Sequence, residues 1–305
     1  RPPINMLPET RNFRVFSGRP QQRGAAIVTA LLVVALATTA ATWLLQRMDR
    51  WIERVAIQRD RAQAQALSRS ALALCTLVLD IDSRRSSTDS LDEEWARTLP
   101  PMRVGEHDIS VQMLDLQGRF NLNNLSRQDG RIDEEGLAAY RRLLAQLALP
   151  EQLAGRLVAH LAGEPSGLAG RTLLLWGELG RVTDYTPDVL ARLEAHVAVL
   201  PGRQPINVNT ASAEVLAAIQ PGLDLSLARA LIQSRQTQAF TQLIDYRKRV
   251  DDITPLPALM PLSTASQHFL ARVRIRGPRS TNRFDSLLQR QSGAAPARIL
   301  WTRTH

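Results

Sequence analysis

The feature that most constrains the fold is an uncharged apolar run near the start of the chain. From Ala25 to Leu45 (AAIVTALLVVALATTAATWLL) there are 21 residues and none is charged. As a helix this run is about 31 Å long, which matches the hydrocarbon core of a bilayer. Arg19 and Arg23 precede it, and Arg47 and Arg50 follow it. The run therefore predicts one membrane-spanning helix.

Helical periodicity continues beyond the run. Apolar residues recur at spacings of three and four through Leu44, Met48, Trp51, Ile52 and Val55, and neither proline nor glycine occurs in residues 25–82. This pattern predicts one helix over 25–82, first membrane-spanning and then amphipathic. The single cysteine, Cys75, lies in its apolar part, and we interpret it as a packed thiol.

The rest of the chain alternates between strand and helix patterns. Residues 107–114 alternate as a strand, residues 133–249 are helical throughout, and strand character returns in 268–276 and 299–302. Thr186 and Thr210 are expected helix caps. This order predicts an α+β fold in which a helical block interrupts a sheet domain. The predicted divisions are a leader (1–24), the helix (25–82), a discontinuous sheet domain (83–125 with 263–305) and an inserted helical domain (126–262).

Basic charge is concentrated at the two ends. The net charge is +9, and Lys248 is the only lysine. Such an excess is found in proteins that bind nucleic acid or an anionic membrane surface, but its distribution along the chain is more informative. The arginines before the apolar run fit a cytoplasmic flank. We interpret those between Arg272 and Arg303 as solvated surface, with a partner-facing patch as the alternative.

Motifs for catalysis or metal binding are weak. The five histidines show no HExxH or HxxxH spacing, and the sequence contains no GxGxxG or Walker loop. Residues 129–135 are acidic but lack the ligand spacing of an EF-hand, so we read them as a helix start. No enzymatic activity is expected, although sequence alone does not exclude a nucleophile triad.

A helix-hairpin-helix pattern is the most distinctive local feature. Residues 206–216 (INVNTASAEVL), Pro221-Gly222 and 228–232 resemble such units, which bind DNA backbones in other proteins. Here the turn lacks a second glycine, and Asp224 places negative charge where a phosphate would lie. We therefore expect a structural hairpin and no nucleic-acid binding.

The junction of leader and apolar run resembles a type IV prepilin signal. Arg23-Gly24 directly precedes the run. The resemblance implies that a prepilin peptidase cuts between Gly24 and Ala25 and methylates the new N-terminus. We expect an extended, accessible backbone at this glycine.

Further strings resemble the K-type minor pseudopilins of type II secretion over residues 20–276. They are residues 24–34, 118–125 (GRFNLNNL), 200–201 and 206–211 (INVNTA). The resemblance implies a pseudopilin fold: a long N-terminal helix packed on a small antiparallel sheet, with a large all-α insertion. It also implies an inner-membrane protein with a periplasmic globular part that forms the pseudopilus tip and initiates assembly. The implied partners are the I- and J-type minor pseudopilins, the major pseudopilin, the prepilin peptidase and the inner-membrane platform.

Two positions depart from the family pattern. Family members usually carry aspartates after the second helix of the insertion that contribute to calcium binding, whereas Glu164 is the only acidic residue in 158–166 (VAHLAGEPS). We therefore expect no cofactor and weak or no calcium binding. Most pseudopilins also carry glutamate at the fifth mature position. Here that position is Thr29. A subunit with no neighbour ahead of it has no ammonium to pair with a glutamate, so a neutral residue predicts a subunit at the tip. The alternative is that Thr29 is only a tolerated small residue.

Two other functions were considered. One is a secreted DNA-uptake protein, cleaved after small residues such as Ala37 or Ala40-Ala41 and using the hairpin. The other is an uncleaved single-span membrane hydrolase. The amphipathic continuation to about residue 80 argues against a cleaved signal peptide, and the lack of a catalytic motif argues against the hydrolase. Arginine counts on the two sides of the span do not determine its orientation.

Overall fold

The computed structural model describes residues 22–98, 100–127, 129–162, 172–291 and 295–305. It divides after Gln58 into an N-terminal segment and a folded unit that begins at Arg59. Helix α1, Gln22–Arg85, is continuous through this division. The predicted long helix is confirmed and extends slightly further at both ends. Residues 1–21 of the predicted leader lie outside the described residues.

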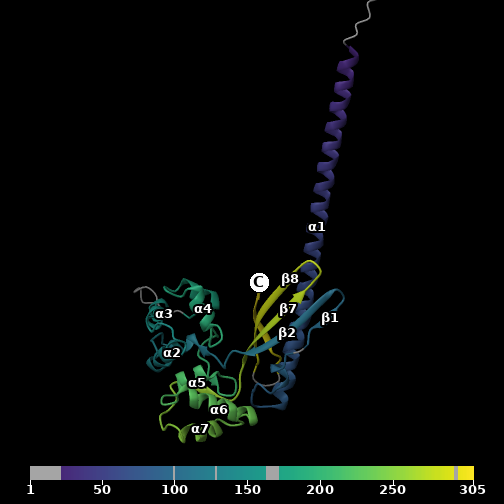
Figure 1. Cartoon of the computed structure of the whole chain (residues 1–305). Helices are drawn as coiled ribbons and strands as arrows, with labels where there is room; N and C mark the ends of the chain where they lie inside the picture. The colour runs from purple at the N-terminus through teal and green to yellow at the C-terminus, as the bar shows by residue number, and fades with distance from the viewer. Residues whose placement is uncertain (1–21, 99, 128, 163–171, 292–294) are drawn as a thin grey trace, which may run out of the picture. The chain divides into compact units, whose positions relative to one another are not determined.

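The folded unit contains a five-stranded antiparallel sheet in the order β1-β2-β7-β8-β9 (Figure 1). Its strands are β1 (Met102–Val104), β2 (His107–Asp115), β7 (His268–Arg276), β8 (Thr281–Gln289) and β9 (Arg298–Thr304). In the β2–β7 pairing, Asp108 lies opposite Arg276 and Asp115 lies opposite Phe269. Strands from before and after the helical block therefore share one sheet, which confirms the predicted α+β pseudopilin fold.

One face of the sheet packs against the part of α1 that belongs to the folded unit. Strand β7 alternates, so every second side chain enters this core: Phe269, Ala271, Val273 and Ile275. Helix α1 supplies Ala64, Ala71, Leu72, Cys75 and Leu79. Trp95, in the short 3-10 helix η1 (Glu94–Ala96), packs edge-on against Phe269 with ring centres 5.0 Å apart. Cys75 is buried here as predicted, and burial raises its pKa to about 11.

The inserted region holds six α-helices among its described residues (Figure 1). They are α2 (Glu134–Gln146), α3 (Gln152–Ala162), α4 (Pro187–Leu193), α5 (Ala213–Ile219), α6 (Leu225–Thr237) and α7 (Leu243–Asp251). The 3-10 helices η2 (Leu122–Leu125) and η3 (Trp176–Arg181) accompany them. These helices share a hydrophobic core of their own. The cap at Thr186 is confirmed, because its side chain accepts a hydrogen bond from the Val189 amide. Helix α5 is capped by Ser212, so the expected cap at Thr210 is wrong.

Several strands had no clear signal in the sequence. Two short parallel pairs brace the insertion: β3 (Phe120–Asn121) with β4 (Val197–Ala198), and β5 (Ile206–Asn207) with β6 (Leu262–Ser263). Strand β8 was also not predicted. Its buried positions include Asp285 and Ser286, which break the apolar alternation. Across the sheet, Arg272 lies opposite Asp285 and compensates its charge.

Candidate functional site

The N-terminal part of α1 exposes an apolar surface all round the helix. Every residue from Gly24 to Val55 is exposed, and an 18-residue window of α1 reaches a mean hydropathy of 2.1. A soluble amphipathic helix would instead bury one apolar stripe. This segment has the length and composition of a single transmembrane anchor.

The predicted cleavage site lies within the first turns of α1. Because the helix begins at Gln22, the backbone at Gly24 and Ala25 is helical, and the expectation of an extended backbone here is wrong. A Cβ built at Gly24 would meet no atom within 4 Å, so the position is sterically open. Helix ends fray readily, and a peptidase would have to unwind this turn. Cleavage and methylation at Gly24 and Ala25 remain predictions.

Thr29 satisfies its hydroxyl within its own helix. Its Oγ1 donates to the carbonyl oxygens of Ala25 and Ala26, each at 3.0 Å. Thr38 behaves in the same way toward Val34, at 2.9 Å. Such back-bonding gives each of these two hydroxyls a partner where water is absent. The Thr29 hydroxyl therefore does not require a hydrogen-bond partner from a neighbouring subunit.

The two family-like strings, residues 118–125 and 206–211, meet where the insertion joins the sheet. A Cβ at Gly118 would lie 2.6 Å from Thr210 Oγ1 and 2.8 Å from the Thr210 carbonyl carbon. Only glycine permits this approach. Close contact between the two strings therefore explains why a glycine opens the first one.

Asn207 is the centre of a buried polar network at this junction. Its Nδ2 donates to the Asp89 carbonyl at 3.0 Å, to Asp115 Oδ2 at 3.1 Å and to Ser266 Oγ at 2.9 Å. Burial raises the pKa of Asp115, and hydrogen bonds from Ser266 and Thr210 oppose that rise. A buried carboxylate with several donors fixes the geometry of the segments that supply them. The INVNTA string thus joins the insertion to the sheet.

Three asparagines of the string 118–125 bind residues 200–204, the segment that leads into the string 206–211. Asn121 Nδ2 donates to the Gly202 carbonyl at 2.8 Å, and Asn123 Nδ2 donates to the Leu200 carbonyl at 2.7 Å. Asn124 Nδ2 donates to the Gln204 carbonyl at 2.8 Å. Side-chain amides thereby satisfy buried carbonyls that lie outside regular structure. Both distinctive strings have structural roles.

The helix-hairpin-helix unit consists of α5, a turn and α6. Asp224 caps α6: its Oδ1 accepts hydrogen bonds from the Leu227 amide at 2.9 Å and from Ser226 Oγ at 2.8 Å. These hydrogen bonds lower the pKa of Asp224, so the carboxylate is ionised. A phosphate at this helix start would meet a negative charge that already occupies the amide donors. The turn does not fit a DNA backbone.

A serine, a histidine and an aspartate come together near the start of β2. His107 Nε2 lies 2.9 Å from Asp60 Oδ1, and Ser280 Oγ donates to Asp60 Oδ2. In a hydrolytic triad the histidine contacts the hydroxyl, whereas here the carboxylate separates the two. Asp60 and His107 are also buried. The group connects α1 to the sheet and does not activate Ser280.

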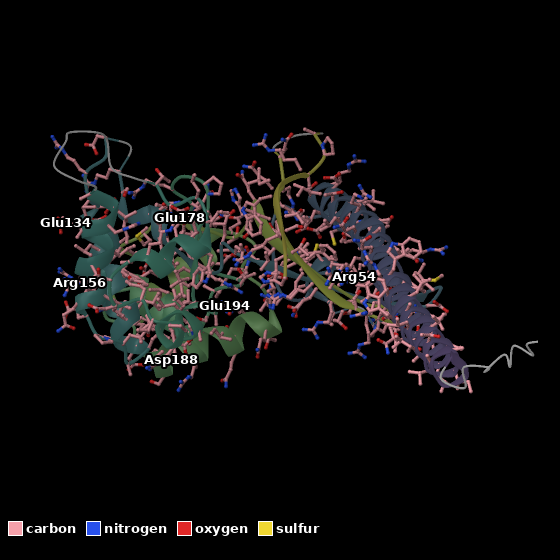
Figure 2. The ribbon with its side chains drawn as sticks, turned by 90° about the horizontal axis from the view of Figure 1, so that it is seen from above. Arg54, Glu134, Arg156, Glu178, Asp188 and Glu194 are labelled. Atoms are coloured by element: carbon pink, nitrogen blue, oxygen red, sulfur yellow. The ribbon has the colours of Figure 1, made fainter. Side chains whose placement is uncertain are left out.

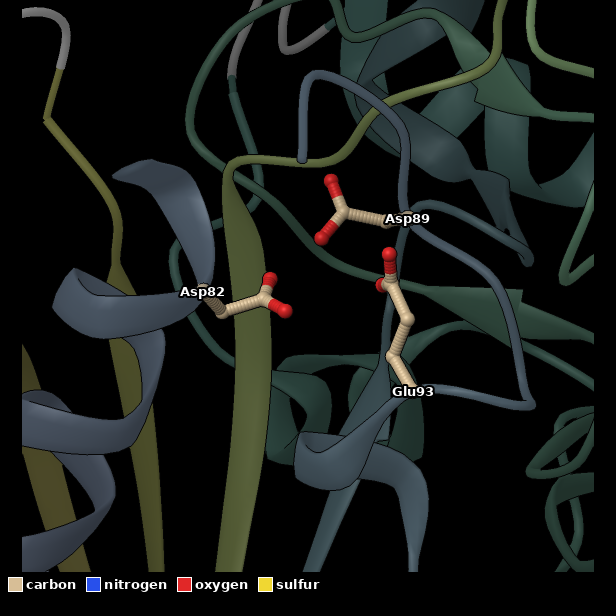
Figure 3. Close-up of side chains that lie close together, drawn as sticks. All are labelled: Asp82, Asp89 and Glu93. Carbon is tan, nitrogen blue, oxygen red and sulfur yellow. The ribbon is translucent and has the colours of Figure 1, made fainter. Parts of the chain in front are cut away.

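Three carboxylates converge where α1 ends (Figure 3). Oxygens of Asp82, Asp89 and Glu93 lie within 4.8 Å of one another. Arg290 already neutralises two of them: its guanidinium lies 2.8 Å from Asp82 and 2.7 Å from Asp89. Glu93 accepts a hydrogen bond from the Trp95 indole at 2.7 Å. The cluster is an internal ion network in which the Arg290 guanidinium supplies the positive charge that a metal ion would otherwise supply.

The calcium stretch of the family has no counterpart in the described part of this region. Residues 158–162 of α3 carry no carboxylate, and Glu164 lies outside the described residues. Calcium requires several oxygen ligands. The residues described here do not fit that ion, and its absence remains a prediction.

The arginines between 272 and 303 divide into two groups. Arg290 is mostly buried and also stacks on Phe269, 4.9 Å from the ring centre, so interpreting the whole cluster as solvated surface is wrong for this residue. Arg272 lies 3.4 Å from both Asp285 and Glu194, the residue after α4 labelled in Figure 2. Arg274, Arg276 and Arg303 are exposed.

Comparison with known proteins agrees with this architecture. Two models described as "Type II secretion system (T2SS), protein K" match residues 118–202 and 206–272. The Type II secretion system protein K of Pseudomonas aeruginosa is 29% identical over 281 residues, covering 82% of this chain and 84% of that protein. The Klebsiella pneumoniae protein of the same name is 26% identical over 314 residues, covering 89% and 93%.

A solved structure shares the fold. It is the GspK-GspI-GspJ complex from the enterotoxigenic Escherichia coli Type 2 Secretion System, matched with a TM-score of 0.64 and 21% identity over 83% of this chain and 99% of that chain. An apolar N-terminal helix, a small antiparallel sheet and a helical insertion together make up a pseudopilin fold. Within that class, the chain belongs to the protein K family of minor pseudopilins.

Proposed function

We propose that this chain forms the tip of the pseudopilus and initiates its assembly, so that the type II system can export proteins across the outer membrane. In this proposal α1 crosses the inner membrane once and the folded unit lies in the periplasm. The prepilin peptidase removes the leader and methylates Ala25. The protein is a structural component without catalytic activity.

The observation that carries the tip assignment is Thr29. After cleavage at Gly24 it would be the fifth residue, where most pseudopilins have a glutamate that pairs with the N-terminal ammonium of the next subunit. An unpaired charge within a membrane span costs up to about 2.5–3.5 kcal/mol, the value at the bilayer centre. Thr29 instead bonds to the carbonyls of Ala25 and Ala26. A subunit with no neighbour ahead of it needs a residue of this kind.

The insertion supports the same position. It adds a body with its own hydrophobic core, and such a body would obstruct subunits stacked above it in a filament. The related GspK was solved in a complex with GspI and GspJ. We therefore propose the I- and J-type minor pseudopilins as partners of this chain, with the major pseudopilin and the inner-membrane platform as further contacts.

Site-specific crosslinking in assembled pseudopili tests the tip assignment. A photoreactive residue at position 29, and a second one in α4, should crosslink to the proposed partners and not to other copies of this chain. Self-crosslinks along the filament shaft would contradict the proposal.

Thr29→Glu provides a sharper variant of that test, with Thr38→Glu as the control for adding a carboxylate to the span. Only Thr29→Glu should bring this chain into the shaft, because only that position can reach a neighbouring ammonium. Equal behaviour of the two variants would show that position 29 has no special role.

A further inference from the structure

One stripe of α1 combines tryptophans and arginines directly after the apolar run. Trp43, Arg47, Arg50, Trp51 and Arg54 together line one depression on the helix surface. At about 100° per residue, all five fall within an arc of roughly 100°. Asp49 and Glu53 fall outside this arc, more than about 100° from its centre. Figure 2 labels Arg54 on the ribbon of α1. We call these five residues the Trp-Arg stripe.

The side chains of the stripe are exposed and arranged for contact with a partner. Trp43 is 55% exposed and Trp51 is 66% exposed. The Arg47 guanidinium lies 5.2 Å from the centre of the Trp43 ring, and Arg50 Nε donates to the Gln46 carbonyl at 3.1 Å. The nearest carboxylates along the helix, Asp49 and Glu53, lie outside the arc of the stripe. Within that arc the stripe presents three guanidinium groups and no carboxylate.

The stripe's position identifies the environment that it meets. Eleven residues of helix span about 16 Å, whereas the polar layer of one leaflet is roughly 5–8 Å thick. Trp43 lies inside the apolar run, at its end, and Arg54 lies beyond the polar layer if the helix is upright. A tilt toward this face brings the indoles and the long arginine side chains into the headgroup layer together.

We propose that the Trp-Arg stripe binds the phosphate of an anionic phospholipid at the outer surface of the inner membrane. The inference rests on insertion of α1 in the membrane and goes beyond the tip assignment. Guanidinium groups bind phosphate through paired hydrogen bonds, and tryptophan favours the membrane interface. Arginines on the translocated side of a span would otherwise oppose its orientation. A lipid ligand gives them a role there.

Lipid titration of the full chain in detergent micelles, read by native mass spectrometry, tests this site. The probes are phosphatidylglycerol, phosphatidylcholine and inorganic phosphate. Each arginine near an anionic surface contributes about a fivefold gain in affinity. The triple variant Arg47→Gln, Arg50→Gln, Arg54→Gln should therefore lose roughly a hundredfold in phosphatidylglycerol affinity. The matched control, Arg69→Gln, Arg84→Gln, Arg85→Gln on the same helix, should bind as the native chain does.

The outcomes are distinct. Preference for phosphatidylglycerol over phosphatidylcholine that only the stripe variant loses supports the lipid site. Equal affinity for the two lipids overturns it, and so does displacement by millimolar inorganic phosphate. Photocrosslinking from position 50 in assembled pseudopili separates a protein partner: efficient crosslinks to another subunit, with no lipid adduct, also overturn the lipid site. Failure of the chain to remain in carbonate-washed membranes would instead contradict the membrane anchor.

Discussion

The two parts of α1 use apolar residues in different ways. From Gly24 to Val55 every side chain is exposed, whereas from Arg59 onward one stripe is buried at spacings of three and four. That stripe consists of Asp60, Ala64, Ser68, Ala71, Leu72, Cys75 and Leu79. One continuous helix therefore has two parts with different surroundings: an exposed apolar part and a part packed against the sheet. The apolar run within the first part has the length and composition of a membrane span, and the second part packs against the sheet on one side.

The largest effect is expected in the packed part. Leu79 is fully buried between α1 and the sheet, whereas Leu77 is 52% exposed. Leu79→Ala should lower the free energy of unfolding by about 2–5 kcal/mol, and Leu77→Ala should change it by less than about 0.5 kcal/mol. Denaturation of the full chain in detergent, followed by tryptophan fluorescence, measures both. Similar losses would mean that the helix does not pack in this orientation.

The next effect separates lipid exposure from water exposure. Val34 and Leu74 are almost equally exposed, at 58% and 53%, yet the account places only Val34 in the bilayer. Val34→Arg should make membrane insertion less favourable by about 2.5–3.5 kcal/mol, whereas Leu74→Arg should leave it unchanged. Membrane fractionation after carbonate washing measures the difference. Equal retention of both variants would remove the distinction between the two parts.

A pH effect should belong to the folded unit. His268 in β7 is fully buried, and burial lowers its pKa to about 4. Between pH 6.5 and 4 the unfolded chain binds a proton that the folded chain does not, so this group reduces stability as the pH falls. The contribution reaches roughly 3 kcal/mol.

Asp89 opposes this trend, because burial raises its pKa to about 6. The folded chain therefore binds this proton more tightly than the unfolded chain, and the resulting gain in stability is lost as the pH rises through 6. His268→Gln removes the contribution of His268 to the pH dependence and leaves that of Asp89. Below pH 6 its stability relative to the native chain should therefore improve, as measured by denaturation at several pH values. A constant difference between pH 7 and pH 4.5 would count against a neutral buried imidazole.

The smallest effect concerns the contact between Asp60 and the β7–β8 turn. A Cβ at Gly277 would lie 2.4 Å from Asp60 Oδ1 and 2.8 Å from His107 Nε2. Gly277→Ala should therefore cost about 1–3 kcal/mol through overpacking. Gly155→Ala in α3 meets no atom within 4 Å and should be neutral or slightly stabilising. If thermal unfolding shows the two variants to be equivalent, α1 is not held to the sheet at Asp60.

Much of the fold was predictable because it depends on patterns local in the sequence. The uncharged run and the spacing of Leu44, Met48 and Trp51 gave α1, and the alternation in residues 107–114 and 268–276 gave the central strands. The two-residue strands were not predictable, since they depend on contacts between distant segments. Strand β8 was missed because its buried Asp285 and Ser286 break the apolar alternation, and Arg272, which lies opposite Asp285, belongs to another strand.

The roles of individual polar residues were less accessible. Asn207 was recognisable as part of a distinctive string, but its three hydrogen bonds reach residues from 59 to 118 positions away. Arg290 was predicted to be surface charge, because its partners Asp82 and Asp89 are distant from it in the sequence. The residues of the Trp-Arg stripe have helical spacing in the sequence, but the sequence analysis did not predict that they form one surface.

We propose that this chain is a processed pseudopilin whose mature helix begins at Ala25, within α1. Mass spectrometry of the mature N-terminus, from cells with active prepilin peptidase, tests it most directly. The account predicts a chain that begins with N-methylated Ala25, leaving Thr29 as the fifth residue. A mature chain beginning at Thr42 would indicate a secreted protein released by signal peptidase, and an intact leader would indicate an uncleaved anchor. Either result would contradict the account.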